Sequence, residues 1–214
     1  MMSDQGLAIV YADAQLVVVD KPGGLLAVPG RGPEKQDCVV NRLKEMFAAC
    51  IDQPAVHRLD MATSGLMVFA LTAEAHRNLS RQFSERRVEK KYVALLEGVV
   101  TASSGEITLS FRLDPENRPW QVYDPVRGKT GITRWQRLEV CGNRTRVEFV
   151  PLTGRTHQLR LHAAHELGLG YPIVGDSLYG SGKQGDPMLL HATMLSFFHP
   201  ESGEKVAFFS PVPF

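Results

Sequence analysis

The sequence contains only three cysteines, Cys38, Cys50 and Cys141, and they lie far apart. This number and spacing are typical of a protein kept reduced, and they argue against a disulfide framework and a Cys-x-x-Cys metal site. No apolar run reaches the roughly 18 residues that a membrane-spanning helix needs. The first residues lack a basic stretch followed by an apolar one, which predicts no secretory signal. We therefore expect a cytoplasmic protein without a membrane partner.

The sequence also has almost no net charge, +1 over 214 residues. This total does not by itself indicate a nucleic-acid partner, because binding needs a local basic patch. The cations are mainly arginines, 16 against 8 lysines, and arginine matches phosphates and base edges better than lysine does. The length and the 43% hydrophobic content predict an ordinary globular protein, which we assign to a single domain spanning residues 1–214.

Short apolar runs separated by turn residues predict many strands and few helices. Asp37, Thr72 and Thr156 are the predicted caps of three helices, the first reaching about residue 49 and the last about residue 168. This mixture shows no regular alternation of strand and helix, so it predicts an α+β fold with a largely antiparallel sheet. The main predicted strands are 9–11, 16–20, 66–71, 88–98, 107–113, 133–140, 144–150 and 206–209.

The most informative stretch of the sequence is His57-Arg58-Leu59-Asp60-Met61-Ala62-Thr63-Ser64-Gly65. It leads directly into the apolar run 66–71, and polar residues at the mouth of a buried strand often carry chemistry. Asp60 has no second acid nearby, which favours a nucleophile or base over a glycosidase pair. For an arbitrary Arg-Leu-Asp triplet, a turn-capping Asp60 and a solvated Arg58 would be the ordinary interpretation.

Two further stretches carry candidate residues. Tyr92 lies in the predicted strand 88–98, where the ordinary role of a tyrosine is a half-buried aromatic. Arg155 and Arg160 follow the strand-breaking Gly154, and an arginine there is ordinarily a surface residue of an amphipathic helix. Residues 21–25, Lys-Pro-Gly-Gly-Leu, end the second predicted strand in a turn.

Together these stretches resemble the motifs of the RluA-type pseudouridine synthases, and the chain is closest to the short members without an N-terminal RNA-binding appendage. The family's His-Arg-Leu-Asp-x-x-Thr-Ser-Gly matches residues 57–65, and its Lys-Lys-Tyr-x-Ala-x-x-x-Gly matches residues 90–98. Its Thr-Gly-Arg-x-His-Gln-Leu-Arg matches residues 153–160, and Lys-Pro-x-Gly-Leu matches residues 21–25. The resemblance implies a mixed, mostly antiparallel β-sheet with a central cleft and flanking helices.

The resemblance also implies an enzyme, an RNA pseudouridine synthase that isomerises uridine in stem-loops of 23S-type ribosomal RNA and tRNA. Asp60 is implied as the nucleophile, attacking either the sugar C1′ or C6 of the uracil ring after the base is flipped out. Tyr92 is implied to stack on that base, and Arg160 to pair with Asp60. No metal or cofactor is implied, and we expect a monomer.

Three further residues are expected to bind the substrate. Arg58 is expected to fill the space that the flipped base leaves, because it lies two residues from Asp60. His57 belongs to the same matched motif. Arg155 is a candidate for contact with an RNA phosphate.

Two alternatives remain open on the sequence. The first is a non-catalytic RNA-binding domain on the same fold, which the loss of Asp60, Tyr92 or Arg160 would favour; all three are present. The second is a nucleoside or glycoside hydrolase with Asp60 as its nucleophile. A second catalytic acid would favour the hydrolase, but Asp176 and Asp186 are isolated residues in predicted loops.

Overall fold

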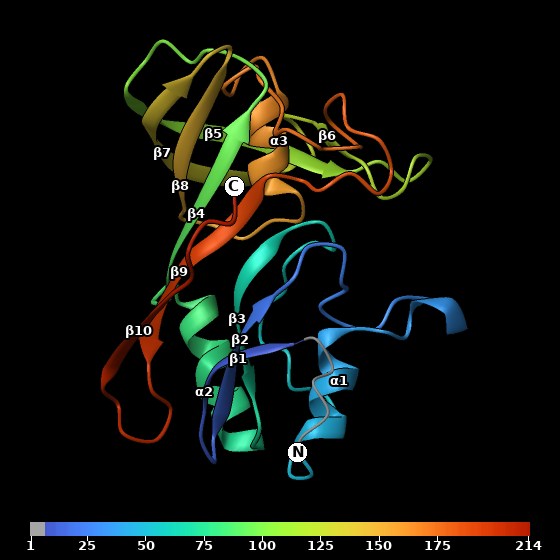
Figure 1. The fold of residues 1–214 in the computed structure, drawn as a ribbon, viewed down its shortest axis with the longest axis vertical. Coiled ribbons are helices and arrows are strands. Elements are labelled where there is room, and N and C mark those ends of the chain that lie inside the picture. The colour runs from blue at the N-terminus through green and yellow to red at the C-terminus, as the bar shows by residue number, and fades with distance from the viewer. Residues whose placement is uncertain (1–6) are drawn as a thin grey trace. The chain divides into compact units, whose positions relative to one another are not determined.

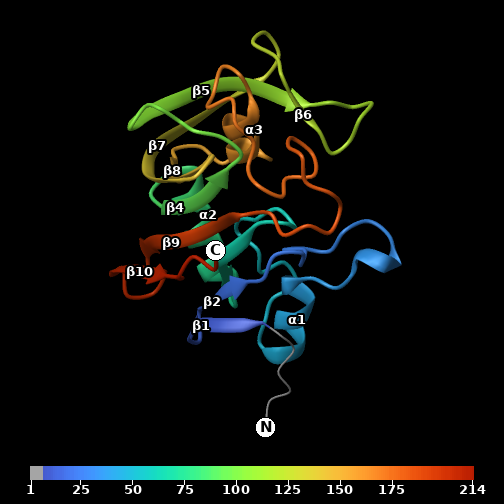
Figure 2. The same ribbon diagram turned by 45° about the horizontal axis from the view of Figure 1, so that its top comes forward.

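The computed structural model describes residues 7–214, which divide into two compact units (Figures 1 and 2). The first unit contains the chain up to Lys90 together with Ala192–Pro213, and the second contains Lys91–His191 with Phe214. None of the helices in the described part is long and apolar enough to cross a membrane. Each unit has its own set of neighbouring strands, so the two are described in turn.

The first unit contains strands in the order β1-β2-β3-β9, and β10 pairs with β9. The β1–β2, β2–β3 and β9–β10 pairs are antiparallel. Strands β2 and β3 are almost completely buried, as their unbroken apolar runs predict. The bounds of these strands are β1 Ala8–Ala12, β2 Leu16–Lys21, β3 Ser64–Ala70, β9 Leu190–Phe198 and β10 Lys205–Phe209.

Helix α2, Ala73–Ser84, packs its apolar stripe on the sheet of this unit. Ala75 and Leu79 join an apolar cluster built mainly from β2, β3 and β9. The predicted cap is confirmed, because the Thr72 hydroxyl accepts a hydrogen bond from the Ala75 N–H at 3.1 Å. The strand β3, which directly follows the 57–65 motif, is thereby held in a rigid layer.

Helix α1, Val39–Met46, is shorter than predicted and has a different cap. Cys38 is the N-cap, and its Sγ accepts from the Asn41 N–H at 3.4 Å. Asp37 was the predicted cap, and this prediction is wrong: its carboxylate instead pairs with Arg42, with Oδ1 2.8 Å from Nε. A short 3₁₀ helix, Pro33–Lys35, precedes α1.

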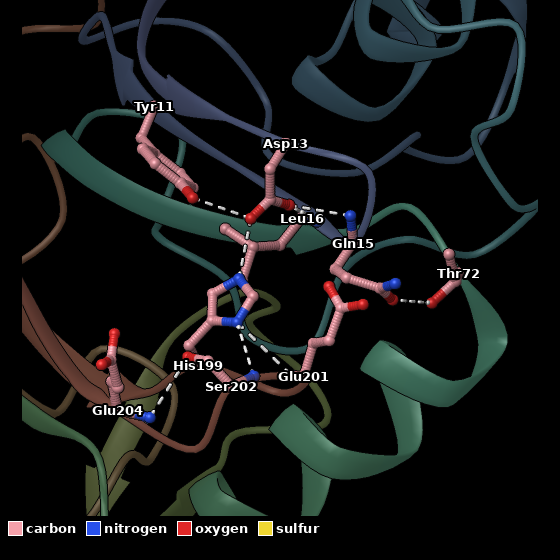
Figure 3. Close-up of polar contacts among 9 residues, drawn as sticks. All are labelled: Tyr11, Asp13, Gln15, Leu16, Thr72, His199, Glu201, Ser202 and Glu204. Carbon is pink, nitrogen blue, oxygen red and sulfur yellow. Dashed lines mark hydrogen bonds and ion pairs between the residues drawn. The ribbon is translucent and has the colours of Figure 1, made fainter.

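A polar cluster around Asp13 joins the β1–β2 turn to the turn between β9 and β10 (Figure 3). The Asp13 carboxylate accepts from the Tyr11 hydroxyl at 2.8 Å and from Nε2 of His199 at 2.7 Å. The backbone N–H groups of Gln15 and Leu16 donate to its other oxygen. Burial raises the pKa of Asp13, but these hydrogen bonds outweigh burial and hold the pKa below its usual range. The carboxylate therefore stays ionised and fixes both turns.

The second unit contains an antiparallel sheet in the order β4-β8-β7-β5-β6. Thr145, Val147 and Phe149 share the buried face of β8, as the period-two pattern predicts. The three-residue strand β6 was not predicted. The bounds are β4 Glu89–Leu96, β5 Ser104–Leu113, β6 Gln121–Tyr123, β7 Lys129–Cys141, β8 Arg144–Pro151 and α3 Gln158–Ala164.

Helix α3 begins one residue later than predicted and ends at Ala164. Thr156 is not its cap; the N-cap is His157, in a left-handed conformation with φ +56° and no capping side chain. The side chain of Gln158 reaches back and accepts from the Arg155 N–H at 3.0 Å, which ties the preceding loop to the first helical residue. The predicted α+β class, with a mostly antiparallel sheet and flanking helices, is confirmed.

Candidate functional site

Asp60 lies in a tight turn of the first unit, immediately before β3. The turn is closed by a hydrogen bond from the Thr63 N–H to the Asp60 carbonyl at 3.1 Å. The Met61 carbonyl accepts from the Gly24 N–H at 2.9 Å and from Nζ of Lys21 at 3.0 Å. Asp60 itself is partly exposed. Two motifs distant in sequence, 21–25 and 57–65, thus hold one carboxylate in a fixed turn.

Lys21 is completely buried beside this turn. Its ammonium group donates to the carbonyls of Pro22 at 2.9 Å, Leu25 at 2.8 Å and Met61 at 3.0 Å. Burial lowers the pKa of Lys21 to about 8, and the charge of Asp60 opposes that fall. A buried cation therefore sits near the Asp60 carboxylate at neutral pH. Sequence reasoning assigned no role to Lys21, although its motif had been matched.

The lowered pKa of Lys21 makes stability depend on pH in a defined direction. Between pH 8 and the ordinary lysine value of 10.5, the unfolded chain binds more protons than the folded one, so stability rises with pH. Relative to Lys21→Met, the wild type should gain about 2 kcal/mol of unfolding free energy from pH 7.5 to 9.5. Urea unfolding of both proteins at both pH values measures the difference. A flat or falling difference would show that Lys21 is not a buried cation.

His57 contributes to the support of the Asp60 turn. Its Nε2 accepts a hydrogen bond from the Val68 N–H of β3 at 3.1 Å, and its ring stacks on Phe83 of α2 with centroids 4.6 Å apart. Burial, with a smaller effect from Lys90, lowers the pKa of His57 to about 3. The ring is therefore neutral and carries its proton on Nδ1. This contact positions the loop, while contact of His57 with substrate stays a prediction.

Arg58 and Gly65 lie on either side of Asp60 in the motif, the first exposed to solvent and the second buried. The Arg58 side chain is exposed and can reach a ligand. Gly65 has φ +109°, and a Cβ there would collide with the backbone N and carbonyl O of Ala192. Only glycine tolerates this combination of backbone angle and close approach. The Thr-Ser-Gly end of the motif therefore lets β3 pass against β9.

Tyr92 lies on β4 in the second unit, directly opposite Phe149 of β8. The residue is 8% exposed, so little of it is open in this structure. Stacking of a base on this ring stays a prediction.

Arg160 lies in α3 and is bound bidentately by Asp176. Its Nε donates to Oδ2 at 2.7 Å and its Nη2 to Oδ1 at 2.6 Å, and both residues are buried. Burial raises the pKa of Asp176, but the hydrogen bonds and charge of Arg160, helped by the N–H groups of Leu178 and Tyr179, lower it below its usual range. The pair is therefore ionic at neutral pH. The pairing of Arg160 with Asp60 expected from the resemblance stays a prediction.

Tyr179 completes this network in the second unit. Its hydroxyl accepts from the Gln121 N–H at 2.8 Å and is hydrogen-bonded to Nδ1 of His157 at 2.9 Å. The Arg160 guanidinium lies over its ring, 5.3 Å from the centroid. From the sequence, Asp176 is only an isolated residue in a predicted loop, and Tyr179 has no predicted role. Their structural role as the support of Arg160 could not be read from the sequence.

Arg155 is exposed on the loop before α3. Its Nε makes only a long hydrogen bond, 3.4 Å, to the Thr130 carbonyl. The guanidinium is thus loosely held and accessible to an anion.

The six predicted site residues divide equally between the two units. The first unit holds His57, Arg58 and Asp60, and the second holds Tyr92, Arg155 and Arg160. Across residues 7–214 the structure contains no group of three or more His, Cys, Asp or Glu side chains that could hold a metal ion.

Comparison with known proteins gives consistent matches. A family model described as RNA pseudouridylate synthase matches residues 15–165, which include all six predicted site residues. The chain is 48% identical to the dual-specificity RNA pseudouridine synthase RluA of Haemophilus influenzae, over 94% of this chain and 91% of that protein. The protein of the same name from Escherichia coli strain K12 is 42% identical, with 97% and 94% covered. Among solved structures, Human RNA Pseudouridylate Synthase Domain Containing 1 has a TM-score of 0.77 and 33% identity, and the match covers 97% of this chain and 84% of that one.

Proposed function

Because this chain belongs to the RNA pseudouridylate synthase family, we propose that it isomerises uridine to pseudouridine in structured RNA, with Asp60 as nucleophile. The observation that carries this proposal is the turn at Asp60, which backbone hydrogen bonds and Lys21 hold next to β3. A nucleophile needs such a fixed position to attack at a defined angle. We further propose that the two units act together as one catalytic domain.

The reaction needs few protein groups. The bond between the sugar C1′ and N1 of uracil breaks, the ring turns, and C5 bonds to C1′. The C5 hydrogen is lost and N1 gains a proton, so atoms and electrons balance without a redox partner. Asp60 attacks either C1′ or C6 to allow the base to turn. The chemistry therefore calls for no cofactor and no metal.

The other residues act on the flipped nucleotide. Flipping the base out of its stack costs a few kcal/mol. The exposed Arg58 fills the vacated space, and Tyr92 offers the base a stacking surface worth about 1–3 kcal/mol. Arg160 pairs with Asp60, while Arg155 contacts a phosphate and His57 lies beside the bound nucleotide.

The substrate class follows from the relatives. Because proteins named dual-specificity RNA pseudouridine synthase are 42% and 48% identical over nearly the whole chain, we propose that this protein modifies two kinds of RNA. These are stem-loops of 23S-type ribosomal RNA and of tRNA, whose splayed loop bases suit recognition by shape. We propose that the protein acts as a cytoplasmic monomer.

Tritium release tests this function. Total bacterial tRNA and ribosomal RNA labelled at uracil C5 should each lose tritium to water when the protein is added, because C5 must expel its hydrogen to bond C1′. RNA without protein is the control. Absence of release from both RNAs would contradict the proposal, and release from only one would contradict dual specificity. Free uracil in place of tritiated water would identify a hydrolase.

A further inference from the structure

Trp120 is an exposed aromatic residue in the second unit, at the end of the connection from β5 to β6. It is 40% exposed, and its indole N–H makes no hydrogen bond to any described residue. Its backbone is fixed nonetheless: its N–H donates to the Asn117 carbonyl at 2.9 Å, and its carbonyl accepts from the Asp114 N–H at 2.9 Å. The connection therefore presents a large apolar ring to solvent from a rigid base.

The ring of Trp120 is supported from one side by the network of Arg160. It packs edge-on against Tyr179, with centroids 5.4 Å apart and planes at 69°. Tyr179 in turn lies under the Arg160 guanidinium and holds the Gln121 N–H next to Trp120. An exposed aromatic ring thus stands two contacts away from a residue proposed to act in catalysis.

Two of the acidic side chains of this region, Asp114 and Asp124, accept hydrogen bonds from the protein itself. Asp114 accepts from the Glu116 N–H and the Asn117 side-chain amide. Asp124 accepts from the Arg127 N–H and from the Arg112 guanidinium, which lower its pKa to about 2.

By contrast, the basic residue nearest to Trp120 in sequence has an exposed side chain without a partner in the described part of the chain. Arg118 is exposed and makes no hydrogen bond or ion pair with the part of the chain that the structure describes. Arg118 and Trp120 are two residues apart in the chain, and an exposed ring with a cation near it in sequence suits unpaired nucleotides, the ring by stacking and the cation by phosphate contact.

We propose that Trp120 stacks on an unpaired RNA base neighbouring the target uridine, and that Arg118 contacts the adjoining phosphate. This inference rests on the proposed function and extends it to a second base-binding position. Its role is recognition: Trp120 touches RNA outside the reacting nucleotide. The chemistry fits any of the four bases, because each has a π-face.

Tryptophan fluorescence tests the contact directly, because the sequence has only two tryptophans, Trp120 and Trp135. In Trp135→Phe only Trp120 emits, and stacking on a base should quench its emission when the RNA fragment carrying the modified uridine is added. In Trp120→Phe only the buried Trp135 emits, and no quenching is expected. Anisotropy of labelled RNA records binding in the same samples. Bound RNA with unquenched Trp120 would overturn the stacking site and leave the proposed function standing; absence of binding would overturn both.

Measurements of KM and kcat distinguish a role of Trp120 in RNA recognition from a merely structural role. Trp120→Ala should raise KM at least about tenfold with kcat little changed, and Trp120→Phe should restore most of the loss. Arg118→Ala should reduce the dependence of log Kd on log salt by nearly one unit, whereas Trp120→Ala should leave that slope unchanged. An unchanged KM in Trp120→Ala, or a fall in kcat alone, would overturn the proposal. Thermal melts of each variant confirm that it is folded.

Discussion

Asp60→Asn should lose at least about a thousandfold in turnover while it keeps the fold and the binding of RNA. Asparagine has nearly the same shape as aspartate but no anionic oxygen, so it can neither attack carbon nor accept a proton. The turn should survive, because backbone atoms close it: the Thr63 N–H donates to the Asp60 carbonyl, and Lys21 and Gly24 donate to the Met61 carbonyl. The change is therefore confined to the chemistry of one carboxylate.

Tritium release under single-turnover conditions measures this loss, and a gel shift on the same RNA measures binding. Asp52→Asn is the matched control, because Asp52 is a fully exposed aspartate in the preceding loop with only a 3.6 Å contact to Lys44. This control should retain wild-type turnover. Substantial turnover by Asp60→Asn would remove Asp60 from the nucleophilic role. Loss of RNA binding together with turnover would point to a role in holding the substrate.

The elements with strong local signals could be predicted from the sequence. The buried strands β2 and β3 follow from unbroken apolar runs, and the start of α2 follows from a cap that uses only residues three apart, Thr72 and Ala75. The caps of α1 and α3 were mispredicted, although the contacts that replace them are also local in sequence. Asp37 is taken by Arg42, and the loop before α3 is held by the side chain of Gln158. Several side chains near the start of a helix can make such contacts, and the sequence does not show which of them does.

The candidate site shows the same division. The motif around Asp60 is contiguous, so its residues could be named from the sequence alone. The partners that fix its surroundings are distant: Lys21 lies 40 residues from the Met61 carbonyl, and Asp176 lies 16 residues from Arg160. Whether a lysine or aspartate in a loop is buried depends on the tertiary structure, and neither periodicity nor composition reports it. For this reason the sequence predicts Asp176 only as an isolated loop residue.

Asp176→Asn should destabilise the second unit by about 3–5 kcal/mol, because it removes the carboxylate from a buried bidentate ion pair with Arg160. The Asp176 carboxylate accepts from two nitrogens of Arg160 and from the backbone N–H groups of Leu178 and Tyr179. Asparagine can keep the bonds to one oxygen, but its amide nitrogen would face an Arg160 donor. Urea unfolding at pH 7 measures the loss, and Glu166→Gln, an exposed carboxylate without a partner among the described residues, is the control.

A double-mutant cycle shows whether this cost comes from the pair itself. Arg160→Met should also destabilise, because it leaves the Asp176 carboxylate buried without its cation, but Arg160→Met combined with Asp176→Asn should cost clearly less than the two single changes together. The lowered pKa of Asp176 also determines how the stability advantage of the wild type over Asp176→Asn changes with pH. The wild-type advantage is complete above the ordinary aspartate value near 4 and is lost only as pH falls through the lower folded value. Additive single effects, or an advantage that already declines between pH 7 and 5, would mean that the network around Arg160 and Tyr179 is held by packing and not by this ion pair.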